Sequence, residues 1–477
     1  MFAAKNDLKR IKLIISLAIP ILVLALPTSV FGISGLTIVE HRVIAIFFFA
    51  AFFWILEPIP IYATSLMIIL LELVMISSKG FNLLVSNPNK ESLGQLVDYK
   101  EILFTFASPI IILFLGGFFL AMAATKYRLD QNLAKVLLKP FGQNPKWVLL
   151  GLMIITAVFS MFMSNTATTA MMLSILVPVL AVFLPGDQGR MAFILAIPFA
   201  ANVGGIGTPI GTPPNAVALK YLTGNDQISF GEWMLMALPY VIVLLVVCWA
   251  LLLFIYPIKT EKIHLNIQGA WMRNRKAYIV YITFAGTILL WLTDFLHGMN
   301  SYIVAMFPVA IFSSLNIINK NDLKNISWDV LWLVSGGIAL GLALESSGLA
   351  QRIIDIIPFD VLSPLLIILL ITLVAMLMAN FMSNTATANL LLPLVAAMGI
   401  SLDSLAGFGS GKMLIIAVTI SCSMGIALPI STPPNALAYA TGSIQTKHMA
   451  KPGVIIAIIG ILLNYVLMYL LNIVGFF

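Results

Sequence analysis

A string of seven residues occurs twice in this chain. Residues 162–168 read Phe-Met-Ser-Asn-Thr-Ala-Thr, and residues 381–387 repeat the same letters 219 positions later. Each copy is followed by a second motif, Gly-Thr-Pro-Pro-Asn-Ala at 211–216 and Ser-Thr-Pro-Pro-Asn-Ala at 431–436, and these lie 220 positions apart. Two features in one order at a nearly constant spacing indicate an internal duplication, so each half of the chain must build the same elements.

A glycine pair extends the duplication upstream. Gly116-Gly117 recurs as Gly336-Gly337, again 220 positions later. We expect each pair to bend the chain into a hairpin, and close packing of two helices is the alternative. The duplication predicts four parts: residues 1–34 with a first membrane helix, a first repeat at 35–257, a basic linker at 258–276 and a second repeat at 277–477.

Composition places the duplicated unit in a membrane. Of the 477 residues, 61% are hydrophobic and 9% are charged, whereas soluble domains carry about 25% charged residues. Several apolar runs exceed the roughly 17 residues that a helix needs to cross the hydrocarbon, and shorter ones suggest broken helices or re-entrant hairpins. We therefore predict an all-α polytopic membrane protein. Its apolar runs occupy 12–31, 43–56, 61–78, 147–163, 168–184, 190–201, 232–257, 277–297, 300–317, 361–382, 386–400, 411–428 and 452–476.

Basic residues predict the orientation of the chain. Lys and Arg gather in the first twelve residues, in 126–146 and in 258–276, and such clusters mark cytoplasmic loops. We expect a cytoplasmic N-terminus in a cell membrane. The spans give an odd number of crossings between corresponding points of the repeats, so the second repeat is expected to be inverted. These loops account for the net charge of +7, and no nucleic-acid partner is expected.

The repeated motifs carry polar groups into apolar surroundings. An unpaired polar group is costly there, so each Ser-Asn-Thr is expected to contact a ligand. In Thr-Pro-Pro-Asn, two prolines break the helix and free carbonyl oxygens, which can ligate Na⁺. A helix that starts after each motif directs N–H groups toward an anion. Two inverted copies would give two facing carboxylate holders, suited to a molecule with a carboxylate at each end.

Other function classes are disfavoured by the sequence. Cys248 and Cys422 lie in apolar segments, and the four histidines show no metal-ligand spacing, so a metal centre and a membrane metalloprotease are not expected. The chain lacks a Gly-x-x-x-x-Gly-Lys-Ser/Thr motif, which argues against ATP as the direct energy source. Prolyl half-helices argue against the continuous polar pore of a channel. A secondary transporter, and not an enzyme, remains.

The motifs together resemble one known family. Paired Ser-Asn-Thr motifs, each followed about 45 residues later by a Thr-Pro-Pro-Asn segment, are similar to those of the divalent anion/Na⁺ symporter family of di- and tricarboxylate transporters. The resemblance runs from Glu57-Pro58 to the C-terminus. It implies a homodimer whose protomers each have a scaffold domain and a transport domain. The transport domain would hold two re-entrant hairpins, tipped by Ser-Asn-Thr, and would carry substrate by an elevator motion.

The same resemblance implies a set of site residues. The substrate contacts carried over from the family are Asn165, Thr166, Thr212, Asn384, Thr385, Thr432 and Pro433. The cation contacts are Ser160, Ser164, Asn165 and Gly211 in the first half, and Ala379, Met382, Asn384 and Ser431 in the second. Na⁺ is the coupling ion that these residues would bind, and no other cofactor is implied.

The second cation set departs from the family pattern. Ala379 stands where the first half has Ser160, and sodium-coupled members tend to offer a hydroxyl at that place. Alanine offers no side-chain oxygen, although its backbone carbonyl remains. We therefore favour exchange of C4 or C5 dicarboxylates such as succinate, malate, fumarate and 2-oxoglutarate, as in plastid relatives. Na⁺-coupled symport is the alternative, and a carrier of citrate or another anion is a further one.

Overall fold

The computed structural model describes residues 2–86, 90–183, 186–263, 271–356, 363–401 and 410–477. Within these ranges the chain is helical and has no β-strand, with one isolated bridge between Ser77 and Val97. The predicted all-α class is confirmed. Part of the predicted basic linker, residues 264–270, lies outside the described residues.

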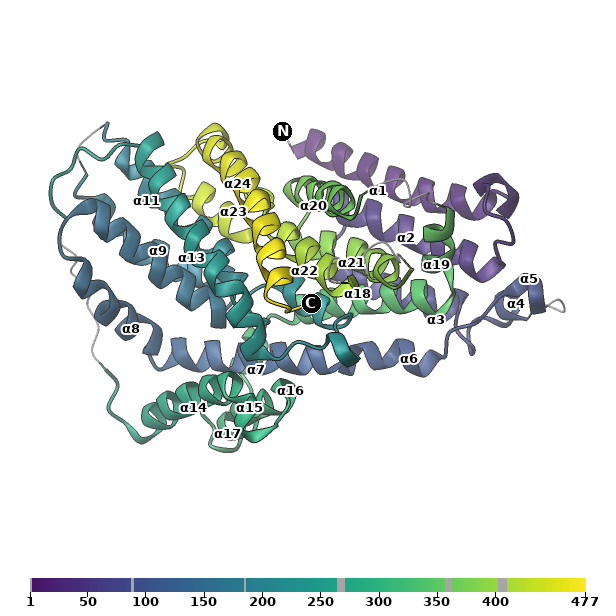
Figure 1. Ribbon diagram of the computed structural model, residues 1–477, viewed down its shortest axis with the longest axis horizontal. Coiled ribbons are helices and arrows are strands. Elements are labelled where there is room, and N and C mark those ends of the chain that lie inside the picture. The colour runs from purple at the N-terminus through teal and green to yellow at the C-terminus, as the bar shows by residue number, and fades with distance from the viewer. Residues whose placement is uncertain (1, 87–89, 184–185, 264–270, 357–362, 402–409) are drawn as a thin grey trace.

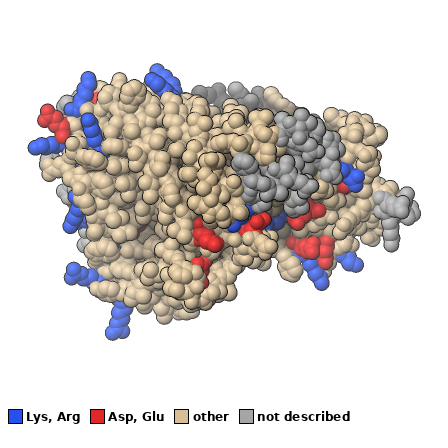
Figure 2. All heavy atoms as spheres, viewed as in Figure 1, with Lys and Arg blue, Asp and Glu red and all other residues tan. Residues whose placement is uncertain are grey.

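Eight described segments are long and apolar enough to cross a membrane. They are α2 (Ile38–Leu56), the run from α6 (Tyr99–Phe104) through α7 (Pro109–Lys126), α9 (Pro145–Phe162), α13 (Phe230–Ile255), α14 (Arg275–Leu292), α18 (Trp328–Ser346), α20 (Pro364–Phe381) and α24 (Thr446–Ile473). Large apolar side chains point outward from them, and Phe254 and Leu235 are 85% and 76% exposed. Figure 2 shows a broad surface without charge, with most Lys and Arg near its borders. Such an exterior is stable in lipid, so this is a multi-pass membrane protein.

The remaining helices complete the fold. They are α1 (Phe2–Ala25), α3 (Ile61–Met75), α4 (Asn82–Val85), α5 (Lys90–Leu93), α8 (Leu129–Leu138), α10 (Asn165–Leu180), α11 (Gly189–Gly205), α12 (Pro213–Leu219), α15 (Asp294–His297), α16 (Ser301–Val304), α17 (Met306–Ser314), α19 (Leu349–Ile356), α21 (Asn384–Ser401), α22 (Ser410–Cys422) and α23 (Pro433–Ala440). The order from α7 to α13 matches the order from α18 to α24. Each of these runs has a long helix, a short one, a helix pair, a broken helix and a long final helix.

The two glycine pairs do not bend the chain, contrary to expectation. Both lie inside continuous helices, α7 and α18, which are absent from the predicted apolar runs. A Cβ at Gly116 would overlap the carbonyl of Ala305, and one at Gly336 would overlap Ser65. These glycines therefore let neighbouring helices approach closely, which is the alternative role. Glycine is tolerated inside a membrane helix when close packing offsets its flexibility, so the pairs are poor markers of a break.

The helices form two regions, and each has its own buried apolar cluster; Figure 1 shows how the helices of the two regions are arranged. One buried cluster joins α2, α3, α18 and α19, at the right of the view. The larger cluster joins α7, α9, α11, α13, α22 and α24, and the packed neighbours α9, α11, α13 and α24 lie at the left. Helices α14 to α17 pack below α7. The repeated motifs lie where helices of these regions meet.

Candidate binding site between the two repeats

Each Ser-Asn-Thr motif forms the turn between two helices. Helix α9 ends at Phe162, Ser164 caps the next helix by accepting a hydrogen bond from the Ala167 N–H at 3.4 Å, and α10 begins at Asn165. The second copy is built alike, because Ser383 accepts from the Ala386 N–H at 3.1 Å. Serine is a favoured N-cap since its hydroxyl satisfies a backbone N–H that has no helical partner. The asparagine and threonine of each motif are thus the first two residues of a helix.

Each Thr-Pro-Pro-Asn motif starts a half-helix. Thr212 and Thr432 are the extended N-caps of α12 and α23, and a proline follows at the first helical position. Proline suits that position because its missing N–H would have had no helical partner. The motif predicts the break correctly. Two prolines leave no N–H at the first two helical positions of either half-helix, and the N–H groups of Asn215 and Asn435 bond to Thr212 and Thr432.

The asparagine of each Thr-Pro-Pro-Asn motif hydrogen-bonds to the backbone of the broken segment. The Asn215 side-chain amide donates to the carbonyls of Gly205, Ile206 and Thr208 at 3.1, 3.1 and 2.8 Å. The Asn435 amide donates to the carbonyls of Ile426 and Leu428 at 2.8 and 2.9 Å. These carbonyls are freed by the break and would otherwise be unsatisfied. Part of the carbonyl set that the sequence suggested for Na⁺ is therefore already paired.

All four helix starts open into one cavity of about 330 Å³. The seven predicted substrate contacts line it together: Asn165, Thr166, Thr212, Asn384, Thr385, Thr432 and Pro433. The volume lies near the lower end of small-molecule pockets, roughly 300–1,000 Å³. Residues more than 200 positions apart thus share one wall, as the duplication requires.

The first predicted cation set forms a compact group of oxygens. The Ser160 hydroxyl contacts the Asn165 side-chain oxygen and lies 2.7 Å from the Ala201 carbonyl. A Cβ at Gly205 would lie 2.9 Å from both the Asn165 amide and the Gly211 carbonyl oxygen. Ser164 and Gly211 line the cavity, and Ser160 lies behind it, fully buried. Hydroxyl, amide and carbonyl oxygens are the neutral ligands available to a hard cation.

The second predicted cation set is less complete. Ala379 and Met382 are buried and do not line the cavity, whereas Asn384 and Ser431 do. The Ser431 hydroxyl donates to the Asn380 carbonyl at 2.8 Å. Within the described chain, the Asn384 side-chain oxygen is buried and has no hydrogen-bond partner. The alanine at 379 explains this difference, since the matching oxygen of Asn165 is contacted by Ser160.

Several lining residues were not anticipated. Asn202 and Asp329 contribute polar groups, and Tyr62, Phe114 and Phe118 contribute aromatic walls. Asn202 is a lone amide within an apolar segment, which is the signal that marks it. Asp329 lies in the first turn of α18, where a carboxylate is stabilised by the helix dipole. Among the described residues lining the cavity, Asp329 is the single charged side chain.

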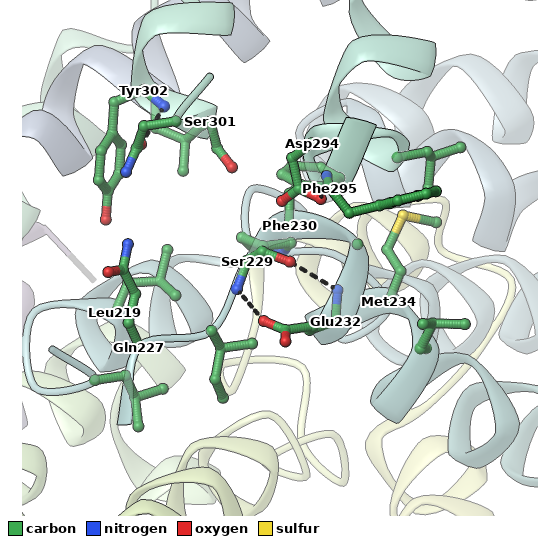
Figure 3. Close-up of a pocket in the computed structure, with 18 of the residues that line it drawn as sticks. Leu219, Gln227, Ser229, Phe230, Glu232, Met234, Asp294, Phe295, Ser301 and Tyr302 are labelled. Carbon is green, nitrogen blue, oxygen red and sulfur yellow. Dashed lines mark hydrogen bonds between the residues drawn. The ribbon is translucent and has the colours of Figure 1, made fainter. Parts of the chain in front are cut away.

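A larger cavity, about 940 Å³, lies away from the motifs (Figure 3). It is lined by the segment before α13, the start of α13 and helices α15 and α16. Its Ser229 and Glu232 form a capping box, with the Glu232 carboxylate accepting from the Ser229 N–H at 2.7 Å. These polar groups serve the helix start and include none of the repeated motif residues. Size alone therefore does not identify the binding site.

Comparisons with known proteins agree over most of the chain. A family model described as citrate transporter matches residues 51–409. The sodium-dependent dicarboxylate transporter SdcS of Staphylococcus saprophyticus is 31% identical over 468 residues, covering 90% of this chain and 85% of that one. An uncharacterized transporter of Haemophilus influenzae is 30% identical over 455 residues, covering 91% and 90%. The SdcS protein of Staphylococcus aureus is 30% identical over 470 residues, covering 89% and 85%.

A solved structure supports the fold. The Alcanivorax borkumensis YdaH transporter, whose crystal structure is described as having an unusual topology, aligns with a TM-score of 0.54 at 13% identity. The alignment covers 87% of this chain and 99% of that one. With the family match and the relatives above, the conclusion is that this chain belongs to the divalent anion/Na⁺ symporter family, in the citrate transporter group that the family model describes, and is a membrane transporter and not an enzyme.

Proposed function

We propose that this protein is a secondary transporter of small dicarboxylates. The observation that carries the proposal is the convergence of four helix starts, two from each repeat, on one cavity of about 330 Å³. Helices α10 and α21, which begin at Asn165 and Asn384, can hold an anion through their first backbone N–H groups, and the prolyl starts of α12 and α23 add partial positive charge. Pairs of such ends from two repeats suit a molecule with a carboxylate at each end. The names of the Staphylococcus relatives, sodium-dependent dicarboxylate transporters, agree with this substrate class.

Substrate size follows from the cavity. C4 and C5 dicarboxylates such as succinate, malate, fumarate and 2-oxoglutarate have two carboxylates a few bonds apart, which matches two holders facing one small space. Citrate is the second candidate, because the matching family model is described as citrate transporter. Its third carboxylate would need a further donor in the cavity.

Charge balance favours coupling to Na⁺ over exchange. The cavity carries Asp329 and, among its described lining residues, no Lys or Arg. Each helix N-terminus supplies roughly half a positive charge, so four ends at most balance a dianion and leave Asp329 uncompensated. A co-bound cation would supply the missing charge, and the oxygens around Asn165 and the unpartnered oxygen of Asn384 are suitable ligands. Dicarboxylate exchange is the second candidate, because Ala379 offers no side-chain oxygen to a second cation.

The manner of transport completes the proposal. Helix pairs α9–α10 and α20–α21 would be re-entrant hairpins, and with the broken helices α11–α12 and α22–α23 they would form a transport domain. That domain would move as an elevator against a scaffold that includes α2, α3, α14 and α18, with the second repeat inverted and the N-terminus in the cytoplasm. The functional unit would be a homodimer.

The test is uptake of labelled succinate by proteoliposomes. We expect uptake to require an inward Na⁺ gradient and to disappear when choline replaces Na⁺ on both sides. Internal dicarboxylate without Na⁺ should not restore it. Restoration by internal dicarboxylate would establish exchange instead, and absence of dicarboxylate uptake under every condition would refute the proposed function.

A further inference from the structure

The orientation of one asparagine at the site can be assigned from its surroundings. The Asn435 side-chain amide lies 2.8 and 2.9 Å from the carbonyl oxygens of Ile426 and Leu428. Carbonyl oxygens accept hydrogen bonds and cannot donate them, so the NH₂ group of Asn435 must face these two atoms. The side-chain oxygen of Asn435 consequently faces the other way, toward α11.

This assignment fixes the next residue in the network. Asn202, on α11, places its side-chain nitrogen 3.1 Å from the Asn435 side-chain oxygen and 3.1 Å from the Thr432 hydroxyl. Because the Asn435 atom is an acceptor, Asn202 must present its NH₂ group, which has two protons to donate. One proton goes to Asn435 and the other to Thr432. Asn202 is only 3% exposed, so water does not offer these groups an easy alternative.

Thr432 is left with a single remaining role. Its hydroxyl oxygen accepts from Asn202 and also from the Asn435 backbone N–H at 3.3 Å. A hydroxyl has two acceptor positions and one proton, so both acceptor positions are used. Among the hydrogen bonds between residues that the structure describes, the Thr432 hydroxyl only accepts and donates none. Thr432 lines the cavity, and the hydroxyl is therefore preset to donate into it.

The half-helix α12 of the first repeat has no equivalent donor. The residue that corresponds to Asn202 in the second repeat is Cys422, 220 positions later, and a cysteine cannot supply an amide donor to Thr212. Correspondingly, the Asn215 side-chain oxygen is buried without a partner among the described residues. Thr212 makes no cap hydrogen bond through its side chain. The two repeats thus offer unequal hydroxyls. The Thr432 hydroxyl is held as a donor, and the Thr212 hydroxyl is not constrained by this network.

We infer that Asn202 is a positioning residue that fixes the Thr432 hydroxyl as a hydrogen-bond donor to one substrate carboxylate. The inference rests on the proposed function, because it takes the cavity to bind a dicarboxylate. Preorganised donors bind more tightly, since no reorientation is needed when the ligand arrives. The carboxylate at the second repeat is held by a fixed donor, and the opposite end meets the less constrained Thr212. The transporter should therefore tolerate chemical changes to the substrate better at the end that faces Thr212.

A double-mutant cycle tests this role. Asn202→Cys installs the residue that the second repeat has at the same place, and Thr432→Val removes the hydroxyl while keeping the shape. We expect Asn202→Cys to raise the KM for succinate about tenfold, the loss typical of one hydrogen bond to a charged group, with maximal uptake rate changed less. In the Thr432→Val background the same change should have no further effect on KM. Thr432→Ser should stay near the parental KM.

A matched cycle with Thr212 serves as the control. In the Thr212→Val background, Asn202→Cys should still raise the KM about tenfold, because Asn202 does not act through Thr212. Folding of each variant is checked by size-exclusion elution, and Asn202→Ala replaces the cysteine variant if that one is not recovered folded. An equal KM increase in the Thr432→Val background, or an unchanged KM in Asn202→Cys, would overturn this inference alone. A parent protein that does not take up dicarboxylates would overturn the proposed function as well.

Discussion

Asn165 and Asn384 occupy the same place in the two repeats but differ in one contact. The side-chain oxygen of Asn165 is contacted by Ser160, whereas that of Asn384 has no partner among the described residues. A buried acceptor without a partner is unfavourable, so we expect a bound ligand to compensate it. The single substitution of serine by alanine at 379 thus makes the two halves of the site chemically unequal.

Replacing either asparagine tests the site at this scale. Asn165→Ala and Asn384→Ala should each abolish transport, because each amide contributes contacts to a charged ligand worth roughly 1.5–3 kcal/mol apiece. Uptake of labelled succinate is the measurement, with size-exclusion elution to verify folding. Ser174→Ala, on the exposed side of the same helix as Asn165, is the control and should transport normally. Uptake within twofold of the parent in both asparagine variants would refute the assigned site.

Ser160 offers a separate test of the first cation set. Ser160→Ala makes the first repeat resemble the second, and the oxygen of Asn165 loses the hydroxyl that contacts it. We expect the Na⁺ concentration that gives half-maximal uptake to rise about tenfold. The KM for succinate at saturating Na⁺ should stay within about twofold of the parent, which separates an effect on cation binding from a general loss. An unchanged Na⁺ dependence would argue against a cation at this position.

The half-helices are the elements that create the site. Each break leaves carbonyl groups without helical partners, and the asparagine of Thr-Pro-Pro-Asn satisfies them from within the same motif. The motif therefore breaks the helix with its prolines and satisfies the freed carbonyls with its asparagine. This lets an irregular backbone persist inside a membrane protein, where unpaired groups are especially costly.

Replacing Asn215 tests whether its side chain stabilises the broken segment. Asn215→Asp keeps the shape but cannot donate, so the carbonyls of Gly205, Ile206 and Thr208 lose their donor. The free energy of unfolding should fall by about 1–3 kcal/mol or more, seen as a lower midpoint of thermal unfolding for the purified protein. Asn300→Asp is the control, because Asn300 caps α16 at an exposed position and aspartate caps equally well. Equal midpoints for the parent and Asn215→Asp would contradict this role.

Local chemistry made some elements predictable and left others hidden. Prolines and N-cap serines determine where helices break and start, so the motif turns and half-helices follow from the sequence. Helices α7 and α18 were missed because Gly-Gly normally weakens a helix, and its tolerance here depends on Ala305 and Ser65 lying close by. The role of Asn202 depends on α11 packing against residues 230 positions away. Contacts of that kind are not visible in a single sequence.

At the scale of the whole molecule, long-range contacts join the two repeats. Lys126, at the end of α7, pairs with Asp322 before α18 at 2.6 Å. Arg352 on α19 pairs with the buried Glu40 on α2 at 2.7 Å. The cavity is itself shared, since neither repeat alone contributes both pairs of helix starts. The duplication thus provides two half-sites, and the tertiary fold brings them together.

In the proposed function, one cavity binds both carboxylates of the substrate. The most direct measurement is competition against labelled succinate uptake by unlabelled succinate and by monomethyl succinate, which has the same chain length but one carboxylate. Succinate should compete at least about tenfold more strongly than monomethyl succinate, because the ester leaves one anion-binding end of the cavity without its charge-assisted contacts. Acetate, with a single carboxylate, should compete weakly as well. Equal competition by succinate, monomethyl succinate and acetate would contradict a two-ended site.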